Sequence, residues 1–292
     1  MTQHEEWVFL NGHVVPAEEA TVSVFDAGFT HAAGLFETLR AYRGRVMRLD
    51  DHVERLATSA ATLGLQIPVD KDLIRRGVDD VLQVNNLSDA RLRIVLTPGG
   101  VPRPGKEGET SAPPTLLITA GVVRAYPPEL YKSGMRVCIC PYKQNRLDPL
   151  AGHKTLAYLS RLMAMKEAAD RRCNESLWFT TENRLAEGSV CNVFVVHEKT
   201  ILTPPLDTPV LPGTVRKAVI ELARENELAL EEKPIDIETL LAAKEVFLTG
   251  SVLEIMPVTS IEKHQVGEGL PGETTQRLST LYRELVAREC GG

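Results

Sequence analysis

The sequence has 292 residues, a formal net charge of -6 at pH 7, and ordinary shares of hydrophobic (43%) and charged (25%) residues. This length suggests two globular domains whose cores need no disulfide or metal to be stable. The acidic balance argues against a general nucleic-acid-binding protein, whose surface would be basic. No apolar run is long enough to span a membrane, and the N-terminus lacks the basic and apolar regions of a signal peptide.

The first half of the chain predicts a strand-rich domain. Asn11-Gly12 between two apolar runs is typical of a tight hairpin. Strands are expected over residues 36–42, 45–49, 90–96 and 116–120. Asp50 is expected to cap a helix that carries His52, Leu56 and Leu63, and a second helix is expected over 71–84. Residues 97–114, rich in Gly and Pro, predict a mobile loop.

The second half again mixes strands and helices. Strands are expected over residues 135–142, 175–180, 191–197, 200–203 and 245–249. Helices are expected after Lys154, where Leu159, Leu162 and Met163 have helical spacing, and over 214–228 and 274–288. The predicted fold class is therefore α+β or mixed α/β, without internal repeats.

Cysteine and histidine spacing predicts no metal site. The five cysteines are odd in number and include no CxxC pair, and the seven histidines show no HExxH spacing. We expect reduced, mostly buried thiols in a cytoplasmic protein.

Three local features are candidates for chemistry. Lys154 has apolar neighbours at a loop-to-helix junction; it is either a solvated lysine or a desolvated amine suited to Schiff-base chemistry. Glu187 precedes Gly-Ser at the entry to an apolar strand and is either a turn residue or a functional carboxylate. The turns LPGTVR and LTGSVLE offer backbone N–H groups near helix or strand ends, which cap helices in most proteins and bind phosphate in some.

Five segments together resemble the fold type IV, or class IV, aminotransferases, which use pyridoxal 5′-phosphate. The segments are DAGFTHAAGLFETLRAYRGRVMRLDDHVERL, HKTLAYL, RLAEGSVCNVFVV, LPGTVRKAVIELA and EVFLTGSVLEIMPVTSIEKHQVGEG. The resemblance extends over nearly the whole chain and is strongest to branched-chain amino acid aminotransferases. D-amino acid aminotransferases and aminodeoxychorismate lyases share much of the pattern.

The resemblance implies roles for individual residues in holding the cofactor. Lys154 matches the lysine that forms the Schiff base and then moves the proton, and Glu187 matches the acid that faces the pyridine nitrogen. Tyr158 matches a tyrosine that hydrogen-bonds the phenolic oxygen of the cofactor. The residues matched to its phosphate site are Arg55, the N–H groups of Gly213, Thr214 and Val215, and the hydroxyl of Ser251, where relatives often have Thr.

The substrate side departs from the family pattern at one position. Branched-chain relatives often have Tyr-x-Arg where this chain has Arg91-Leu92-Arg93, so Arg93 matches and Arg91 replaces the tyrosine. Both arginines share one face of a strand; they either bind a second carboxylate, as in glutamate, or Arg91 is a solvated edge residue. Phe36 is expected at the substrate pocket or in the core. The N–H groups of Gly250, Ser251 and Val252 are candidates for the substrate α-carboxylate.

The resemblance implies an enzyme that moves an amino group from an α-amino acid, a branched-chain L-amino acid in our interpretation, to 2-oxoglutarate by a ping-pong mechanism. The alternatives are an aminodeoxychorismate lyase, a D-amino acid aminotransferase, and a catalytically silent pyridoxal-phosphate-binding protein. The implied architecture is a smaller N-terminal α/β domain (1–121), a connector (122–130) and a larger C-terminal cofactor-binding domain (131–292), with the cofactor between the domains. A homodimer is also implied.

Overall fold

The computed structural model describes residues 6–100 and 112–291. The chain divides into two compact units: the first comprises residues 1–124, 153–157 and 289–292, and the second comprises 125–152 and 158–288. Within the described ranges, no helix is long and apolar enough to cross a membrane. Most of the predicted Gly- and Pro-rich loop, residues 101–111, lies outside the described residues.

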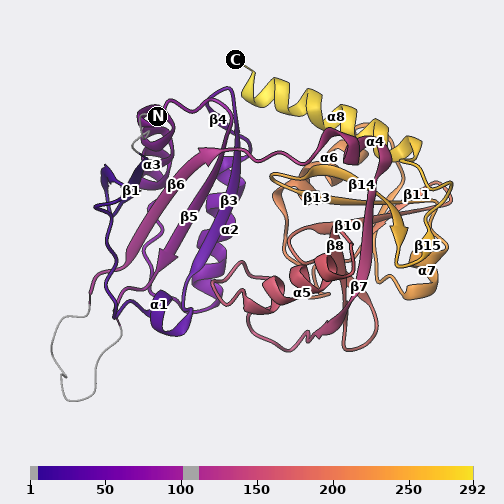
Figure 1. Cartoon of the computed structure of the whole chain (residues 1–292), viewed down its shortest axis with the longest axis horizontal. Helices are drawn as coiled ribbons and strands as arrows, with labels where there is room; N and C mark the ends of the chain where they lie inside the picture. The colour runs from indigo at the N-terminus through magenta and orange to yellow at the C-terminus, as the bar shows by residue number, and fades with distance from the viewer. Residues whose placement is uncertain (1–5, 101–111, 292) are drawn as a thin grey trace. The chain divides into compact units, whose positions relative to one another are not determined.

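The first unit contains a six-stranded antiparallel sheet in the order β2-β1-β6-β5-β3-β4 (Figure 1). Its strands are β1 (Trp7–Leu10), β2 (His13–Pro16), β3 (Leu35–Tyr42), β4 (Arg45–Val46), β5 (Ala90–Thr97) and β6 (Thr115–Val122). The predicted Asn11-Gly12 hairpin is confirmed, because Leu10 pairs with His13 and both turn residues have positive φ (49° and 98°). This backbone matches the twist of the flanking strands.

Helices α2 (Leu49–Thr62) and α3 (Lys71–Val84) pack on this sheet, and α1 (Ala27–His31) is a short helix before β3. The α3 prediction is confirmed. The predicted strand over 45–49 is wrong beyond Val46, and so is the Asp50 cap. Arg48 takes a left-handed conformation (φ 54°), turns the chain, and is itself the N-cap of α2. Asp50 lies in the first turn and binds Arg75 instead.

Apolar and polar side chains alternate along β3 and β5, so the two faces of the first sheet differ in composition. One face packs its apolar side chains against α2 and α3 to form the core: Leu35, Leu39, Ala41, Ala90, Leu92, Ile94, Leu96, Val53, Leu56, Ile74, Val78 and Val81. The opposite face carries residues 36, 38 and 40 of β3 and residues 91, 93 and 95 of β5, because successive side chains of a strand point to opposite faces. This second face is called the arginine face below, after Arg40, Arg91 and Arg93.

The second unit contains a nine-stranded mixed sheet in the order β12-β11-β10-β13-β14-β7-β8-β9, with β15 paired to β14. Its strands are β7 (Met135–Gln144), β8 (Glu175–Thr180), β9 (Leu185–Gly188), β10 (Asn192–His197), β11 (Thr200–Thr203), β12 (Leu230–Glu232), β13 (Glu245–Gly250), β14 (Glu254–Ile261) and β15 (His264–Gln265). The sequence predicted β7, β8, β10, β11 and β13 but not β9, β12, β14 or β15. Pro257 interrupts the strand pattern of β14, since proline lacks the N–H that a strand donates.

Helices of the second unit are α4 (Pro128–Ser133), α5 (Leu159–Asp170), α6 (Thr214–Glu225), α7 (Ile237–Leu241) and α8 (Glu273–Cys290), of which the last two residues belong to the first unit. The helix predicted after Lys154 exists as α5, yet the residues that predicted it are exposed: Leu159 (70%), Leu162 (54%) and Met163 (47%). Ala164 and Ala168 form its buried face instead. Helix α6 buries most of its residues and contacts β13.

Candidate active site

Lys154 is attached to the beginning of β3 by backbone hydrogen bonds. The N–H of Phe36 donates to the carbonyl of Lys154 (3.0 Å), and the N–H of Leu156 donates to the carbonyl of Gly34 (2.9 Å). The Lys154 Nζ lies 4.4 Å from the centroid of the Phe36 ring. The sequence-predicted lysine and aromatic residue are therefore neighbours, on backbone that a strand holds in place.

A buried polar cluster lies between β3 and α2. The Glu37 carboxylate accepts from the Nε (2.8 Å) and Nη2 (2.5 Å) of Arg55, and it contacts the Nδ1 of His52 at 2.8 Å. The side chains of Glu37 and His52 are buried, and that of Arg55 is 9% exposed. Glu37 thus takes two of the five N–H donors of the guanidinium and fixes its orientation.

The charges of this cluster follow from its burial. Burial alone would raise the pKa of Glu37, but the positive charge of Arg55 and the contacts with His52 hold that pKa well below its usual value. Burial lowers the pKa of His52, the Glu37 charge opposes this, and the positive charges of Arg55 and Lys154 lower it further. At neutral pH the cluster therefore holds one carboxylate, one guanidinium and a neutral imidazole that donates its Nδ1–H to Glu37.

The predicted substrate residues Phe36, Arg91 and Arg93 lie together on the arginine face. Arg93 pairs with Thr38 across β3 and β5, and its guanidinium carbon lies 3.9 Å from the centroid of the Phe36 ring. Phe36 itself is 2% exposed. Arg91 is exposed and lies directly opposite Arg40. Phe36 thus contacts both Lys154 and Arg93, and Arg91 lies two residues farther along the sheet, in the next pair on the same face.

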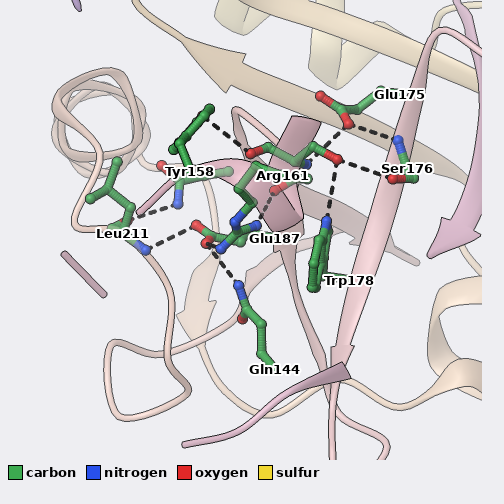
Figure 2. Close-up of polar contacts among 11 residues, drawn as sticks. Gln144, Tyr158, Arg161, Glu175, Ser176, Trp178, Glu187 and Leu211 are labelled. Atoms are coloured by element: carbon green, nitrogen blue, oxygen red, sulfur yellow. Dashed lines mark hydrogen bonds and ion pairs between the residues drawn. The ribbon is translucent and has the colours of Figure 1, made fainter. Parts of the chain in front are cut away.

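Glu187, on β9, is held by three donors in the second unit (Figure 2). Its Oε1 accepts from the Nη2 of Arg161 (2.6 Å) and the Nε2 of Gln144 (3.1 Å), and its Oε2 accepts from the N–H of Leu211 (2.9 Å). The side chain is 7% exposed. Arg161 also lies over the ring of Trp178 (4.7 Å), which fixes the guanidinium. The Glu187 carboxylate is therefore buried and held by hydrogen bonds, unlike that of a solvated turn residue.

A second polar cluster adjoins Glu187 through Ser189 (Figure 2). The Ser189 hydroxyl contacts Ser176 (3.0 Å) and accepts from Trp178 Nε1 (3.2 Å), and the Ser189 carbonyl accepts from Tyr158 Oη (3.5 Å). Burial raises the pKa of Tyr158 to about 12. The Tyr158 hydroxyl therefore keeps its proton at neutral pH and acts as a hydrogen-bond donor.

The beginning of α6 is connected to Glu187 by way of Asn192. The carbonyl of Leu211, whose N–H binds Glu187, accepts from Asn192 Nδ2 (2.8 Å). A Cβ on Gly213 would lie 1.9 Å from Asn192 Oδ1, so a larger residue there would displace the Asn192 side chain. Gly213 is the N-cap of α6 and has no side chain that could cap the helix.

The remaining predicted residues form the turn between β13 and β14. Gly250 pairs with Glu254, so Ser251, Val252 and Leu253 form a three-residue connection, and Tyr131 Oη donates to the carbonyl of Leu253 (3.1 Å). Asn192 pairs with Thr249, the residue before Gly250. Asn192 therefore connects this turn, the beginning of α6 and, through Leu211, Glu187.

The family model described as Amino-transferase class IV matches residues 34–261, more than half of the chain and all of the site residues described above. The chain belongs to the class IV aminotransferases. This assignment confirms the resemblance seen in the sequence, and the mixed α/β fold agrees with it.

Known relatives of this class IV aminotransferase include more than one activity. A putative branched-chain-amino-acid aminotransferase of Methanocaldococcus jannaschii is 33% identical over 95% of this chain and 96% of its own. An aminodeoxychorismate lyase of Bacillus subtilis is also 33% identical, over 95% and 94%. The crystal structure of an Escherichia coli branched-chain amino acid aminotransferase matches with a TM-score of 0.89 and 28% identity, over 96% and 94% of the two chains.

Sequence reasoning missed the residues that hold the predicted ones in place. They are Glu37, His52, Gln144, Arg161 and Asn192. Glu37 carried a signal, because it stands among Leu35, Leu39 and Ala41 on the apolar side of an alternating strand, where an acid needs a partner. The others carried none, since each meets its partner only where elements that are distant in the sequence pack together.

Proposed function

We propose that this class IV aminotransferase uses pyridoxal 5′-phosphate to move an amino group from a branched-chain L-amino acid to 2-oxoglutarate by a ping-pong mechanism. The observation that carries the proposal is Lys154, fixed by backbone bonds to β3 with its Nζ against Phe36. The likeness to branched-chain enzymes over nearly the whole chain supports the choice of substrate.

The functional groups of the candidate site are of the chemical types that this cofactor requires. It offers an amine (Lys154), a structured carboxylate (Glu187), a protonated phenol (Tyr158), and a helix N-terminus whose Gly213 leaves no room for a Cβ. When bound, pyridoxal phosphate supplies a carbonyl carbon for Schiff-base formation and a protonated ring that withdraws electrons from the substrate α-carbon.

We assign Lys154 to the Schiff base and to proton movement at its Nζ. An amine released from that bond becomes a general base and acid close to the substrate α-carbon. The Phe36 ring beside Nζ limits the access of water from that side. Fixation of the Lys154 backbone on β3 would help to hold the amine in place once the cofactor is bound.

Glu187 is assigned to the pyridine nitrogen. Its negative charge would keep that nitrogen protonated. Gln144 and the Leu211 N–H orient this carboxylate, and Arg161 balances part of its charge. Tyr158 is assigned as donor to the phenolic oxygen, a bond that would replace its 3.5 Å contact with the Ser189 carbonyl. Such preorganised charges need no rearrangement during the reaction and therefore lower its barrier.

The phosphate is assigned to Arg55, to the N–H groups of Gly213, Thr214 and Val215, and to the Ser251 hydroxyl. Glu37 orients Arg55 while taking two of its donors, which leaves the guanidinium's charge in a defined place. The dipole of the twelve-residue helix α6 favours an anion at its beginning. We expect Arg55→Ala to raise the dissociation constant of the cofactor strongly and Ser251→Ala to raise it less, measured by titration of the apoenzyme.

The substrate carboxylates are assigned to two places. Gly250, Ser251 and Val252 would bind the α-carboxylate through N–H groups of their turn. Arg93, stacked on Phe36, would bind the γ-carboxylate of glutamate, and the apolar surface of Phe36 would contact a branched side chain. Arg91 also lies on this face, and the comparison of Arg91→Ala with Arg93→Ala on both half-reactions decides which arginine glutamate uses.

A half-reaction screen tests the proposal. We expect L-leucine, L-isoleucine and L-valine to change the cofactor absorbance and 2-oxoglutarate to restore it, with D-alanine much slower. Similarity to the lyase suggests the second candidate, which would release pyruvate from aminodeoxychorismate and leave the three L-amino acids unreacted. In the Lys154→Ala variant, borohydride reduction should give no lysine adduct by mass spectrometry; an adduct at the wild-type level would refute the role of Lys154.

We also propose a homodimer in the cytoplasm. Exposed apolar side chains, among them Phe29 (79%) on α1 and Leu159 (70%) on α5, are surfaces that a second copy would cover. The five cysteines are free, as in proteins of reducing compartments. Light scattering on the purified protein gives the number of subunits, and a monomeric mass would contradict the dimer.

A further inference from the structure

The arginine face carries more positive charge than one glutamate carboxylate requires. Arg40 and Arg91 lie directly opposite each other on β3 and β5 and therefore point to the same face, an arrangement that like charges disfavour. The Arg40 side chain is 16% exposed, and its ion-pair partner is Asp89, 3.7 Å away with its own side chain 60% exposed. The Nε of Arg40 is buried and has no hydrogen-bond partner among the described residues.

Strand register relates this pair to the residues of the proposed reaction centre. Arg93 contacts the Phe36 ring, which also contacts Lys154 Nζ. Arg91 precedes Arg93 by two residues on the same strand, which places the Arg91 Cα about 7 Å farther from Phe36 along the sheet. Arg40 is likewise two residues beyond Thr38, the partner of Arg93. The face therefore offers one cation near Phe36 and two more at the next pair.

The flank of Arg91 is open. Gly121 of β6 is the residue paired with Arg91 on its other side, and a Cβ built on Gly121 meets no atom of the described residues within 4 Å. Its φ is not in the left-handed region, so other residues fit its backbone. An anion that approaches Arg91 from this side would meet no side chain from the paired position.

We propose that Arg40 and Arg91 form a second anion subsite for the terminal carboxylate of dicarboxylic amino or oxo acids longer than glutamate. The inference rests on the proposed function, in which Arg93 serves the shorter substrate. A carboxylate there would accept from the partly exposed Arg40 guanidinium and from the Arg91 guanidinium, and would relieve their mutual repulsion. Two cations with one partly exposed counter-ion favour an acid over a neutral ligand.

Equilibrium binding to the cofactor-loaded protein tests the subsite without requiring turnover. Glutarate and pimelate are titrated calorimetrically, with heptanoate as the single-carboxylate control. We expect Arg91→Gln to weaken pimelate about tenfold and glutarate less than twofold, since one charge-assisted contact is lost. Arg93→Gln is expected to weaken glutarate more than Arg91→Gln does.

Gly121 supplies a matched pair of variants. Gly121→Glu places a carboxylate opposite Arg91 and should abolish the preference for pimelate over heptanoate, whereas Gly121→Gln, of the same size, should retain it. Equal binding of pimelate and heptanoate by the unmodified protein, or equal losses for glutarate and pimelate in Arg91→Gln, would overturn the subsite. Because these titrations do not depend on leucine turnover, a failed subsite and a failed branched-chain assignment give different results.

Discussion

Replacing Glu37 with Gln tests whether the buried cluster behind Arg55 stabilises the first unit. The variant keeps the size of the side chain and one acceptor but removes the negative charge next to a guanidinium that is 9% exposed. Unit charges about 4 Å apart interact by roughly 4 kcal/mol at an effective dielectric constant near 20. Breaking a buried pair costs about 3–5 kcal/mol. Since Gln retains one hydrogen bond, we expect a loss of about 3 kcal/mol.

Because each unit contains one tryptophan, the loss in the free energy of unfolding can be measured for the first unit separately. Trp7 lies in β1 of the first unit and Trp178 in β8 of the second. In a Trp178→Phe background, the fluorescence of Trp7 during urea unfolding follows the first unit alone. The free energy of unfolding is then compared with and without Glu37→Gln.

Asp50→Asn is the matched control, because it removes a carboxylate from an arginine at the surface. Arg75 and Asp50 have side chains 42% and 78% exposed. Exposed pairs contribute little, so we expect no measurable change for this variant. A loss for Glu37→Gln as small as that for Asp50→Asn would refute the reasoning that burial makes this charge important.

Three further predictions concern single positions. Gly213→Ala should destabilise the beginning of α6 by about 1–3 kcal/mol and weaken cofactor binding, because its Cβ would collide with Asn192 Oδ1, while Gly121→Ala should be neutral in thermal unfolding. Glu187→Gln should retain the cofactor but slow single-turnover transamination by about 2–4 kcal/mol in barrier height; an unchanged rate would contradict its role. As pH falls below about 6.5, the unfolded chain protonates His52 while the folded chain resists, so the wild type should lose stability that His52→Asn does not.

The sequence by itself determined the family and supplied the candidate site residues. Lys154, Glu187 and the Gly213 turn stand in short sequence motifs. Such motifs can be recognised from the sequence alone, because each depends on neighbours within a few residues. The same is true of α3, whose capping residue Asp70 and apolar spacing are local. The Asn11-Gly12 hairpin is local too, since the turn residues alone set its backbone.

Only the tertiary structure decided which partners these residues have. Arg55 meets Glu37 because α2 packs on β3, and Glu187 meets Gln144 and Arg161 because three separate elements converge on β9. The exposed apolar residues of α5 show the same limit, since their spacing predicted the helix but not which face is buried. Strand pairing likewise placed Arg40 opposite Arg91, because register depends on the packing of the whole sheet and not on either strand alone.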